Sequence, residues 1–126
     1  MSSENSKFDQ ESRVEDGIVI WEVNGALRQD NLGDLKKKLG KLLHEGHHYF
    51  IFDFEGLNAL DSQGIGFFIS ALREIRTRNG RMVLIRVDAK FAALFELTLL
   101  NRVFEMFTDL ETAKKSFGPV KDKEPV

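Results

Sequence analysis

One segment of the chain brings together residues that could take part in chemistry. Residues 58–68 read NALDSQGIGFF, so that the acid Asp61 and the hydroxyl of Ser62 are followed directly by Gly64 and Gly66. An apolar stretch precedes them and a second one with helical spacing follows, which is the pattern of a strand that leads into a helix. Asp61 or Ser62 could cap that helix, and the Ser62 hydroxyl could also attack a substrate or accept a covalent modification.

Phosphate-binding and dinucleotide-binding loops are poorly matched by this segment. A P-loop, G-x-x-x-x-G-K-[ST], requires a lysine that is absent here, and the fingerprint G-x-G-x-x-G requires a third glycine. Glycines at Gly64 and Gly66, where good helix formers are normally preferred, weaken a first helical turn. We therefore expect that either the sheet or another molecule approaches the backbone closely at this turn.

Catalysis by Ser62 also finds little support. The hydrolase elbow G-x-S-x-G fails because Leu60 occupies the position of the first glycine. The three histidines (His44, His47 and His48) precede a different strand, and in a parallel α/β unit the start of that strand lies at the opposite end from Ser62. The sequence therefore predicts a protein that is not an enzyme, with no catalytic residue, cofactor or metal ligand, and a small hydrolase using Ser62 is the least favoured alternative.

Length and composition predict one cytoplasmic domain. The chain has 126 residues, 42% of them hydrophobic, with eleven phenylalanines and no cysteine, which excludes disulfides and thiolate chemistry. A net charge of −2 gives no sequence-wide basic field for nucleic acid, and no apolar run approaches the roughly 18 residues of a membrane span. We expect disordered tails at 1–6 and 119–126 around a domain at 7–118 that binds no nucleic acid and does not insert into membranes directly.

The order of the predicted elements is a β-hairpin followed by alternating helices and strands. Two apolar alternations, at 8–14 and 18–23, flank Asp16 and Gly17, a pair typical of a type I′ turn. After the hairpin we predict a helix from about Asn31 that ends at Gly46, a strand at 49–54, and a helix from Ser62 to Asn79 with Gly80 at its end. A strand at 82–87, a helix at 90–97 and a strand at 103–107 follow. The last predicted helix is capped by Thr108 and Glu111 and ends near Phe117. This order predicts an α/β domain with a mixed, mostly parallel sheet of about five strands and about four helices.

An ordered series of motifs resembles the STAS-domain family, and most closely the anti-sigma factor antagonists of bacteria. Residues 61–66 match its signature D-S-x-G-[ILV]-G, which stands between a buried strand and an amphipathic helix. Further matches are 23–27 at the family's G-x-L-D turn, 52–57 at its D-L-S-x-L strand exit, 79–83 at its glycine-led strand and 94–100 at its L-F-x-x-T/S-G-L segment. The resemblance covers about residues 8–117 and implies a single STAS-like domain.

This resemblance implies a regulatory role in transcription. The serine after the aspartate is phosphorylated in the family by a serine kinase that is also the anti-sigma factor, so Ser62 corresponds to the phosphoacceptor. The unphosphorylated form would bind the anti-sigma factor and release the sigma factor, phosphorylation would block that binding, and a metal-dependent serine phosphatase would reset the system. The residues expected to contact the partner are Leu27, Arg28, Asp30, Asn58, Asp61, Gln63, Gly64, Gly66 and, if its side chain is exposed, Phe67.

The chain departs from the family pattern at several positions. Arg28 stands where the G-x-L-D turn usually ends in aspartate, with Asp30 two residues further on, and Leu99 replaces the glycine of T/S-G-L. An alternative hypothesis is a STAS subunit of a lipid-transport or other signalling complex, in which Ser62 only caps the helix.

Overall fold

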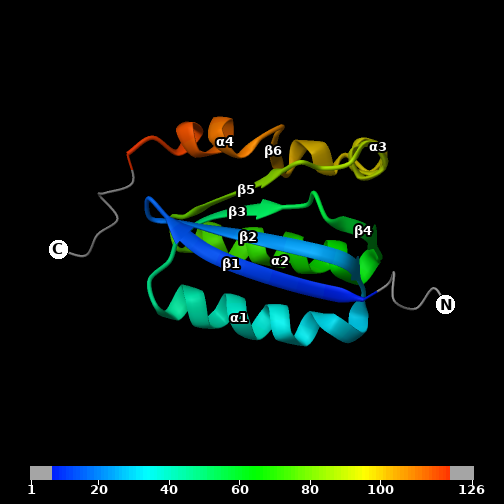
Figure 1. The fold of residues 1–126 in the computed structure, drawn as a ribbon, viewed down its shortest axis with the longest axis horizontal. Helices are drawn as coiled ribbons and strands as arrows, with labels where there is room; N and C mark the ends of the chain where they lie inside the picture. Colours follow the sequence, from blue (N-terminus) through cyan, green and yellow to red (C-terminus); the bar gives the residue numbers. More distant parts are fainter. Residues whose placement is uncertain (1–6, 120–126) are drawn as a thin grey trace.

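A six-stranded mixed sheet organises residues 7–119, which are the residues that the computed structural model describes (Figure 1). Its elements in chain order are β1 (Phe8–Glu15), β2 (Ile18–Leu27), η2 (Gln29–Asn31), α1 (Leu32–His44), β3 (Tyr49–Asp53), β4 (Leu57–Leu60), α2 (Ser62–Thr77), β5 (Arg81–Ile85), α3 (Ala89–Leu97), η3 (Leu100–Arg102), β6 (Glu105–Phe107) and α4 (Leu110–Phe117). The predicted α/β class and the order of elements are confirmed. The tails expected at both ends lie outside the described residues, apart from Pro119.

The N-terminal hairpin forms at the predicted turn. Asp16 and Gly17 both have positive φ values, 54° and 79°, and the antiparallel register pairs Glu15 with Ile18 on either side of them. Positive φ at both central residues is the signature of a type I′ turn, whose twist matches that of the two strands. The hairpin therefore places β2 as a fully paired strand between β1 and β3.

The sheet contains a sixth strand, β4, which the predicted order of elements omitted, although the apolar stretch before Asp61 indicated a strand. The main order is β1-β2-β3-β5-β6, in which only β1 runs antiparallel, and the short strand β4 pairs in parallel with the end of β2 beyond an irregularity at Gly25 and Ala26. The strand β2 is correspondingly longer than predicted, because it continues to Leu27. This extension leads β2 to the edge of the sheet where α2 begins (Figure 1).

The two faces of the sheet are covered unequally. Helices α1 and α2 pack on the face that holds the main core, which includes Trp21, Phe50, Phe52 and Phe68. The opposite face carries a smaller core, where Ala113 of α4 packs against isoleucines of β2 and β3. Trp21 is fully buried, and its ring stacks on Phe52 at a centroid distance of 4.9 Å. The larger core thus anchors the helix that carries the signature motif.

Two helix-end predictions need correction. The helix α2 ends at Thr77, and the residue with a left-handed backbone after it is Asn79, with φ of 62°. Gly80 is required for a different reason, because a Cβ at this position would lie 2.1 Å from the His48 carbonyl oxygen. The N-cap of α4 is Asp109, which accepts a hydrogen bond from the Thr112 amide, so the predicted Thr108–Glu111 capping box is wrong. In both cases the actual residue is a near neighbour of the predicted one.

Candidate functional site

The pairing of β2 with β4 brings two distant turns together. Leu27 and Leu60 are register partners in the parallel ladder, so the turn that begins at Arg28 lies beside the turn that begins at Asp61. The Asp61 amide donates a hydrogen bond to the Leu27 carbonyl at 3.3 Å, which continues the ladder into the first residue of the junction. The G-x-L-D-like turn and the D-S-x-G-I-G motif, more than thirty residues apart in the chain, therefore form one surface.

Asp61, and not Ser62, caps helix α2. The backbone of Asp61 is extended, and its Oδ1 accepts a hydrogen bond from the Gly64 amide at 2.9 Å. Ser62 is the first residue inside the helix and is exposed, and its hydroxyl forms no hydrogen bond with another described residue. The prediction that Ser62 acts as the cap is therefore wrong, and its hydroxyl is left available to solvent.

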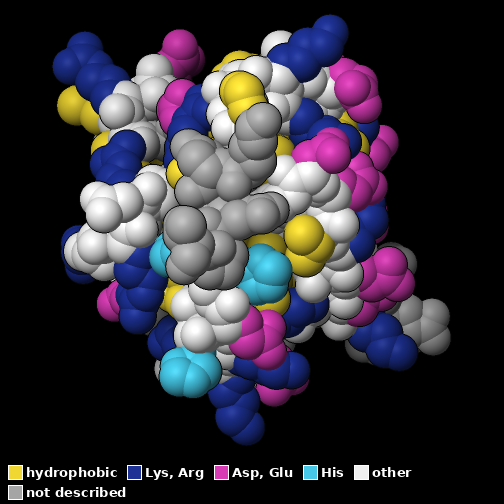
Figure 2. All heavy atoms as spheres, turned by 90° about the vertical axis from the view of Figure 1, so that its left-hand side faces the viewer, with side chains coloured by type: hydrophobic (Ala, Val, Ile, Leu, Met, Phe, Trp, Pro, Cys, Tyr) yellow, Lys and Arg dark blue, Asp and Glu magenta, His cyan; other side chains and the backbone are white. Residues whose placement is uncertain are grey.

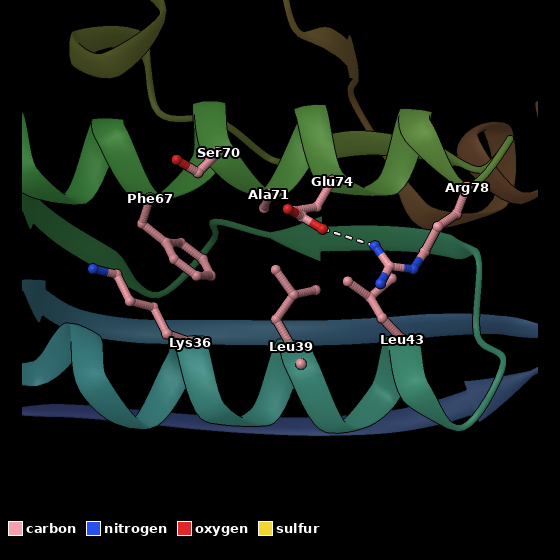
Figure 3. A pocket seen from close by; sticks show the side chains of 9 residues that line it. Lys36, Leu39, Leu43, Phe67, Ser70, Ala71, Glu74 and Arg78 are labelled. Atoms are coloured by element: carbon pink, nitrogen blue, oxygen red, sulfur yellow. Dashed lines mark hydrogen bonds and ion pairs between the residues drawn. The ribbon is translucent and has the colours of Figure 1, made fainter.

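Three of the residues expected to contact a partner are buried. Leu27 is fully buried, Phe67 is 3% exposed, and Gly64 lies against Leu27 and Leu60. A Cβ on Gly64 would come within 2.7 Å of the Leu60 side chain and 3.2 Å of the Leu27 carbonyl oxygen, so this glycine serves the packing of the turn. Figure 3 shows Phe67 pointing from α2 toward α1, where it lines a crevice between the helices. The condition for Phe67 as an anchor, exposure of its side chain, is not met.

The remaining predicted residues face solvent around Ser62. Gln63 and Gly66 are exposed in the first two turns of α2, and a Cβ at Gly66 would meet no atom within 4 Å. Arg28 and Asp30 are exposed in the adjoining turn, and Asn58 is exposed in β4. The two glycines of the motif therefore differ, since Gly64 is required by the fold and Gly66 leaves an open stretch of helix surface.

Two residues that the sequence pattern did not single out hold this surface in place. The Asn31 side chain accepts a hydrogen bond from the Arg28 amide and donates one to the Ala26 carbonyl, so it fixes the Arg28 turn instead of capping α1. Lys90, at the start of α3, donates a hydrogen bond from Nζ to the Asn58 carbonyl at 2.8 Å. The hydrogen-bonding capacity of asparagine in turns was a usable signal for Asn31, whereas nothing local indicated Lys90.

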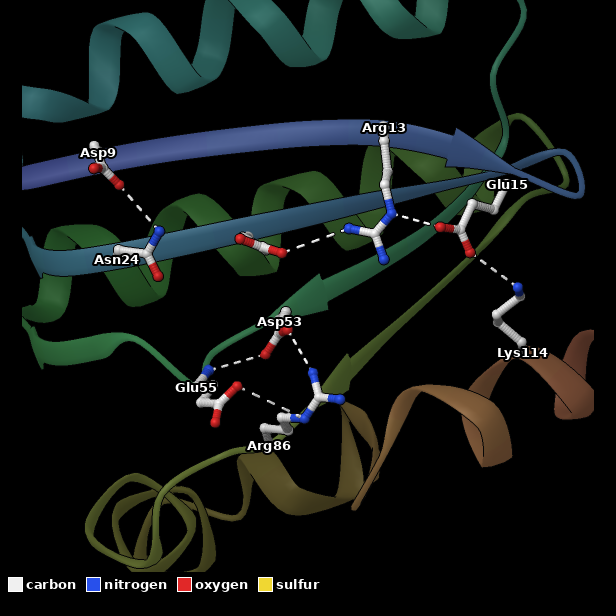
Figure 4. Close-up of polar contacts among 9 residues, drawn as sticks. Asp9, Arg13, Glu15, Asn24, Asp53, Glu55, Arg86 and Lys114 are labelled. Carbon is white, nitrogen blue, oxygen red and sulfur yellow. Dashed lines mark hydrogen bonds and ion pairs between the residues drawn. The ribbon is translucent and has the colours of Figure 1, made fainter.

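A charged pair fixes the turn between β3 and β4 from the other side. The Asp53 carboxylate is 7% exposed; it accepts hydrogen bonds from the Glu55 amide at 3.0 Å and from Arg86 at 2.7 Å (Figure 4). Arg86 has a left-handed backbone, with φ of 55°, which directs its side chain back toward this turn. Because β4 follows the turn directly, the pair contributes to the position of Asp61 and Ser62.

The histidines lie at the far end of the molecule from Ser62. Figure 2 shows their side chains on the left-hand side of Figure 1, where α1 ends and β3 begins, whereas α2 begins on the right-hand side. The opposite placement predicted from the parallel topology is confirmed. Within residues 7–119, no three histidine or acidic side chains are grouped so that they could hold a metal ion. No helix of the same residues is long and apolar enough to cross a membrane.

The fold and this junction define a class of protein. The STAS domain family model matches residues 9–113, so the chain belongs to the STAS domain family. The anti-sigma-B factor antagonist of Staphylococcus aureus is 23% identical over 91 residues, which cover 72% of this chain and 84% of that protein. The fold is similar to that of the anti-sigma factor antagonist SpoIIAA in its unphosphorylated form, with a TM-score of 0.70, 22% identity, and coverage of 89% and 99% of the two chains. SpoIIAA of Bacillus in its phosphorylated form gives a TM-score of 0.68 at 22% identity over 87% and 99% of the two chains.

Proposed function

We propose that this STAS domain is an anti-sigma factor antagonist whose binding to an anti-sigma factor kinase is switched by phosphorylation of Ser62. The unphosphorylated protein binds the kinase and releases the sigma factor, and a metal-dependent phosphatase removes the phosphate. The proposal places the protein in the bacterial cytoplasm, where these partners act. It agrees with the names of the similar proteins, one of which has been solved in a phosphorylated form.

The observation that carries the proposal is the state of the Ser62 hydroxyl. It is exposed at the first position of α2, and the capping task that could have occupied it is performed by Asp61. A hydroxyl with no structural task, on a rigid helix end and beside open backbone at Gly66, suits a kinase that must reach it and a partner that must cover it. The same observation disfavours the alternative in which Ser62 only caps the helix.

The magnitudes favour a switch in binding over a switch in folding. A phosphoserine adds about −1.5 to −2 charges at neutral pH, and at the positive end of a helix such a charge is stabilising by about 0.3–1 kcal/mol. Against a partner surface, an unpaired and desolvated charge costs on the order of 2–5 kcal/mol, or roughly 30-fold to several thousand-fold in affinity. The neighbouring Asp61 adds like-charge repulsion to the phosphate. The fold should therefore persist while the complex dissociates.

The surface around Ser62 bears on which kinase acts. Arg28 provides a positive charge on the adjoining turn where the family usually has a negative one, and Asp30 remains exposed beside it. A kinase matched to this domain should therefore present an acidic group toward Arg28. Arg28→Asp is expected to weaken binding to its own kinase and to improve binding to kinases of antagonists with the usual aspartate.

The test is phosphorylation by the anti-sigma kinase encoded nearest the gene. Incubation with ATP should add one phosphate to the intact mass of the wild-type protein and none to Ser62→Ala. Ser62→Asp should retain the circular dichroism of the wild-type protein and lose the kinase from a pull-down, whereas Ser62→Ala should retain it.

Three results would count against the proposal. A phosphate that persists in Ser62→Ala would place the modified residue elsewhere. Absence of any phosphate, together with stable co-purification of membrane-transport components, would favour a STAS subunit of a transport complex. An unfolded Ser62→Asp protein would contradict the separation of binding from folding.

A further inference from the structure

The turn between α3 and β6 exposes an unusual amount of apolar surface. Among residues 7–119, four large hydrophobic side chains are exposed, and three of them lie in this turn: Leu97 at 83%, Leu99 at 57% and Val103 at 36%. The turn is short and rigid, since η3 lies between Leu99 and Val103 and backbone hydrogen bonds join both residues to it. Isolated exposed leucines are ordinary in proteins, but Leu97 at the end of α3 and Leu99 and Val103 on either side of η3 expose three such side chains within seven residues of the chain.

The backbone conformation of Leu99 gives a second reason to look for a role of its exposed side chain. Leu99 has φ of 64°, in the left-handed region that a residue with a Cβ adopts only under strain, and the family pattern has glycine there. The other non-glycine residues with positive φ are Asp16 and Asn79, of types that tolerate this conformation, and Arg86, whose side chain is held by Asp53. Leu99 has neither compensation, and its side chain gains little from burial within the chain. A strained residue of this kind points to a use outside the fold.

A set of arginines borders the patch. Ile69, Leu72 and Val103 line an open depression of about 360 Å³ between α2 and the turn, together with Arg73, Arg76 and Thr77. Arg102 is exposed in η3. The side chains of Arg73 and Arg102 form no ion pair or hydrogen bond with other described residues. Arg76 exerts only a longer-range attraction on Glu105. The Glu105 carboxylate already accepts two hydrogen bonds from Arg81. In a chain with a net charge of −2, this face therefore carries uncompensated positive charge.

This surface is separate from the Ser62 site. Arg73 lies eleven residues after Ser62 on the same helix, a distance of about 16 Å along the helix axis. None of the residues in the surface was needed to position Ser62. The two surfaces can therefore be tested independently.

We propose that the leucine–arginine surface, formed by Leu97, Leu99 and Val103 with Arg73, Arg76 and Arg102, is a docking site for an acidic amphipathic segment of a partner protein. An apolar side chain of the partner would enter the depression at Val103, and carboxylates beside it would pair with the arginines. Exposed apolar side chains beside three arginines without an ion-pair partner among the described residues match a segment that alternates leucine-like and acidic residues. This inference does not depend on phosphorylation of Ser62.

Two other occupants agree less well with the same observations. A second copy of the chain, related by two-fold symmetry, would place the arginine borders of both copies against each other, which is unfavourable. A lipid surface would meet the arginines favourably, but the apolar centre includes a depression at Val103 and Ile69, which a single inserted side chain can fill and a bilayer surface cannot.

The test uses two synthetic peptides of the same length and leucine pattern, one with glutamate at every charged position and one with lysine. Titration into the ¹⁵N-labelled full chain should give saturable shifts at 69–76 and 97–103 for the glutamate peptide, with a dissociation constant below about 1 mM. The lysine peptide should produce no saturable shifts. Residues around Ser62 should not respond.

Variants separate a docking role from a structural one. Leu99→Gly should raise the unfolding midpoint by about 2–5 °C, because glycine relieves the strain of the left-handed backbone. The same variant should bind the glutamate peptide with an affinity at least about fivefold lower. Asn79→Gly is the matched control, since it changes a left-handed residue outside the surface and should leave peptide binding unchanged. Arg73→Glu with Arg76→Glu should weaken the peptide about tenfold or more, whereas Lys36→Glu with Lys37→Glu on α1 should not.

Four results would overturn this proposal. The first is that the glutamate peptide shows no saturable binding, and the second is that both peptides bind equally well. The third is that sedimentation shows a dimer of the wild-type protein that Leu99→Gly does not form. The fourth is that the protein binds vesicles containing phosphatidylserine and does not bind the glutamate peptide. A Leu99→Gly protein that is both destabilised and unaltered in binding would likewise assign Leu99 to the fold.

Discussion

Two helices of this domain begin with the same capping arrangement but use their hydroxyl groups differently. At α2 the Asp61 Oδ1 accepts a hydrogen bond from the Gly64 amide at 2.9 Å, and at α4 the Asp109 Oδ1 accepts one from the Thr112 amide at 2.8 Å. At α4 the second carboxylate oxygen also accepts hydrogen bonds from the hydroxyls of Thr108 and Thr112. At α2 no hydroxyl joins the cap, and the Ser62 hydroxyl stays exposed without a hydrogen bond to another described residue.

The first residues of the two helices also differ in how much they are buried. The first residue of α4 is Leu110, which packs against the smaller core, whereas the first residue of α2 is Ser62, which is exposed. The end of α4 is therefore built for stability alone. The end of α2 has the same cap but keeps one reactive group out of it, which is what a modification site requires.

The largest expected effect comes from exchanging the third helical residue of the two ends. Gly64→Thr should lower the free energy of unfolding by about 2–3 kcal/mol, because its side chain would collide with Leu60 and the Leu27 carbonyl. Thr112→Gly should cost about 1 kcal/mol, since that position is exposed. Urea unfolding of both variants measures the difference. Equal losses would show that the α2 turn is not tightly packed.

Removing the cap of α2 should have an intermediate effect. Asp61→Ala should lower the free energy of unfolding by about 1 kcal/mol, because the Gly64 amide loses its acceptor. Asp61→Asn keeps an acceptor oxygen and serves as the control, with a smaller loss. If Asp61→Ala unfolded at the same urea concentration as the wild-type protein, Ser62 or water would be acting as the cap.

Acid should affect the cap of α4 in a defined direction. The pKa of Asp109 is held below its usual range, first by the hydrogen bond from the Thr112 amide and then by that from the Thr112 hydroxyl. A carboxyl with a lowered folded pKa stabilises the protein above its unfolded pKa, about 3.9, and loses that contribution as the pH falls through the folded value. The difference in melting temperature between the wild-type protein and Asp109→Ala should therefore shrink below about pH 4. A difference that is constant down to pH 2 would contradict an ionised cap.

The smallest effect is expected at Ser62 itself. Ser62→Ala should change the free energy of unfolding by less than about 0.5 kcal/mol, because the hydroxyl has no partner among the described residues. Thr112→Val, which removes a hydroxyl bonded to Asp109, should have the larger effect of the two. Thermal unfolding of the two variants measures both effects. If Ser62→Ala were the more destabilising of the two, the Ser62 hydroxyl would have a structural role.

Most of the fold was predictable because its signals are local. The Asp16–Gly17 turn fixed the hairpin, and the apolar periodicities located α1, α2 and α3. The position of α4 was predicted from capping residues, although the cap is Asp109 and not Thr108. The strand β4 was missed because it has only four residues and is stabilised by β2, whose own extension passes an irregularity at Gly25. Pairing of this kind depends on residues far apart in the chain, and a single-sequence pattern does not contain it.

The structural tasks of the candidate site residues were only partly predictable. Asp61 and Ser62 are both good capping types one position apart, and only the helix geometry decides which of them accepts the Gly64 amide. The sequence of α2 has an apolar stripe that does not include Phe67 and consists of Ile65, Phe68, Ile69, Leu72 and Ile75. Phe67 is nevertheless buried, because α1 packs beside α2 on the same face. Burial imposed by a second helix is a tertiary effect that the periodicity of one helix does not reveal.

The central claim is that a phosphate on Ser62 changes binding and leaves the fold intact. The most direct measurement compares unmodified and Ser62-phosphorylated protein by urea unfolding and by calorimetric titration with the anti-sigma factor. We predict free energies of unfolding within about 1 kcal/mol of each other and an affinity at least about 30-fold lower for the phosphorylated form. Equal affinities, or a phosphorylated protein that no longer unfolds cooperatively, would contradict the account.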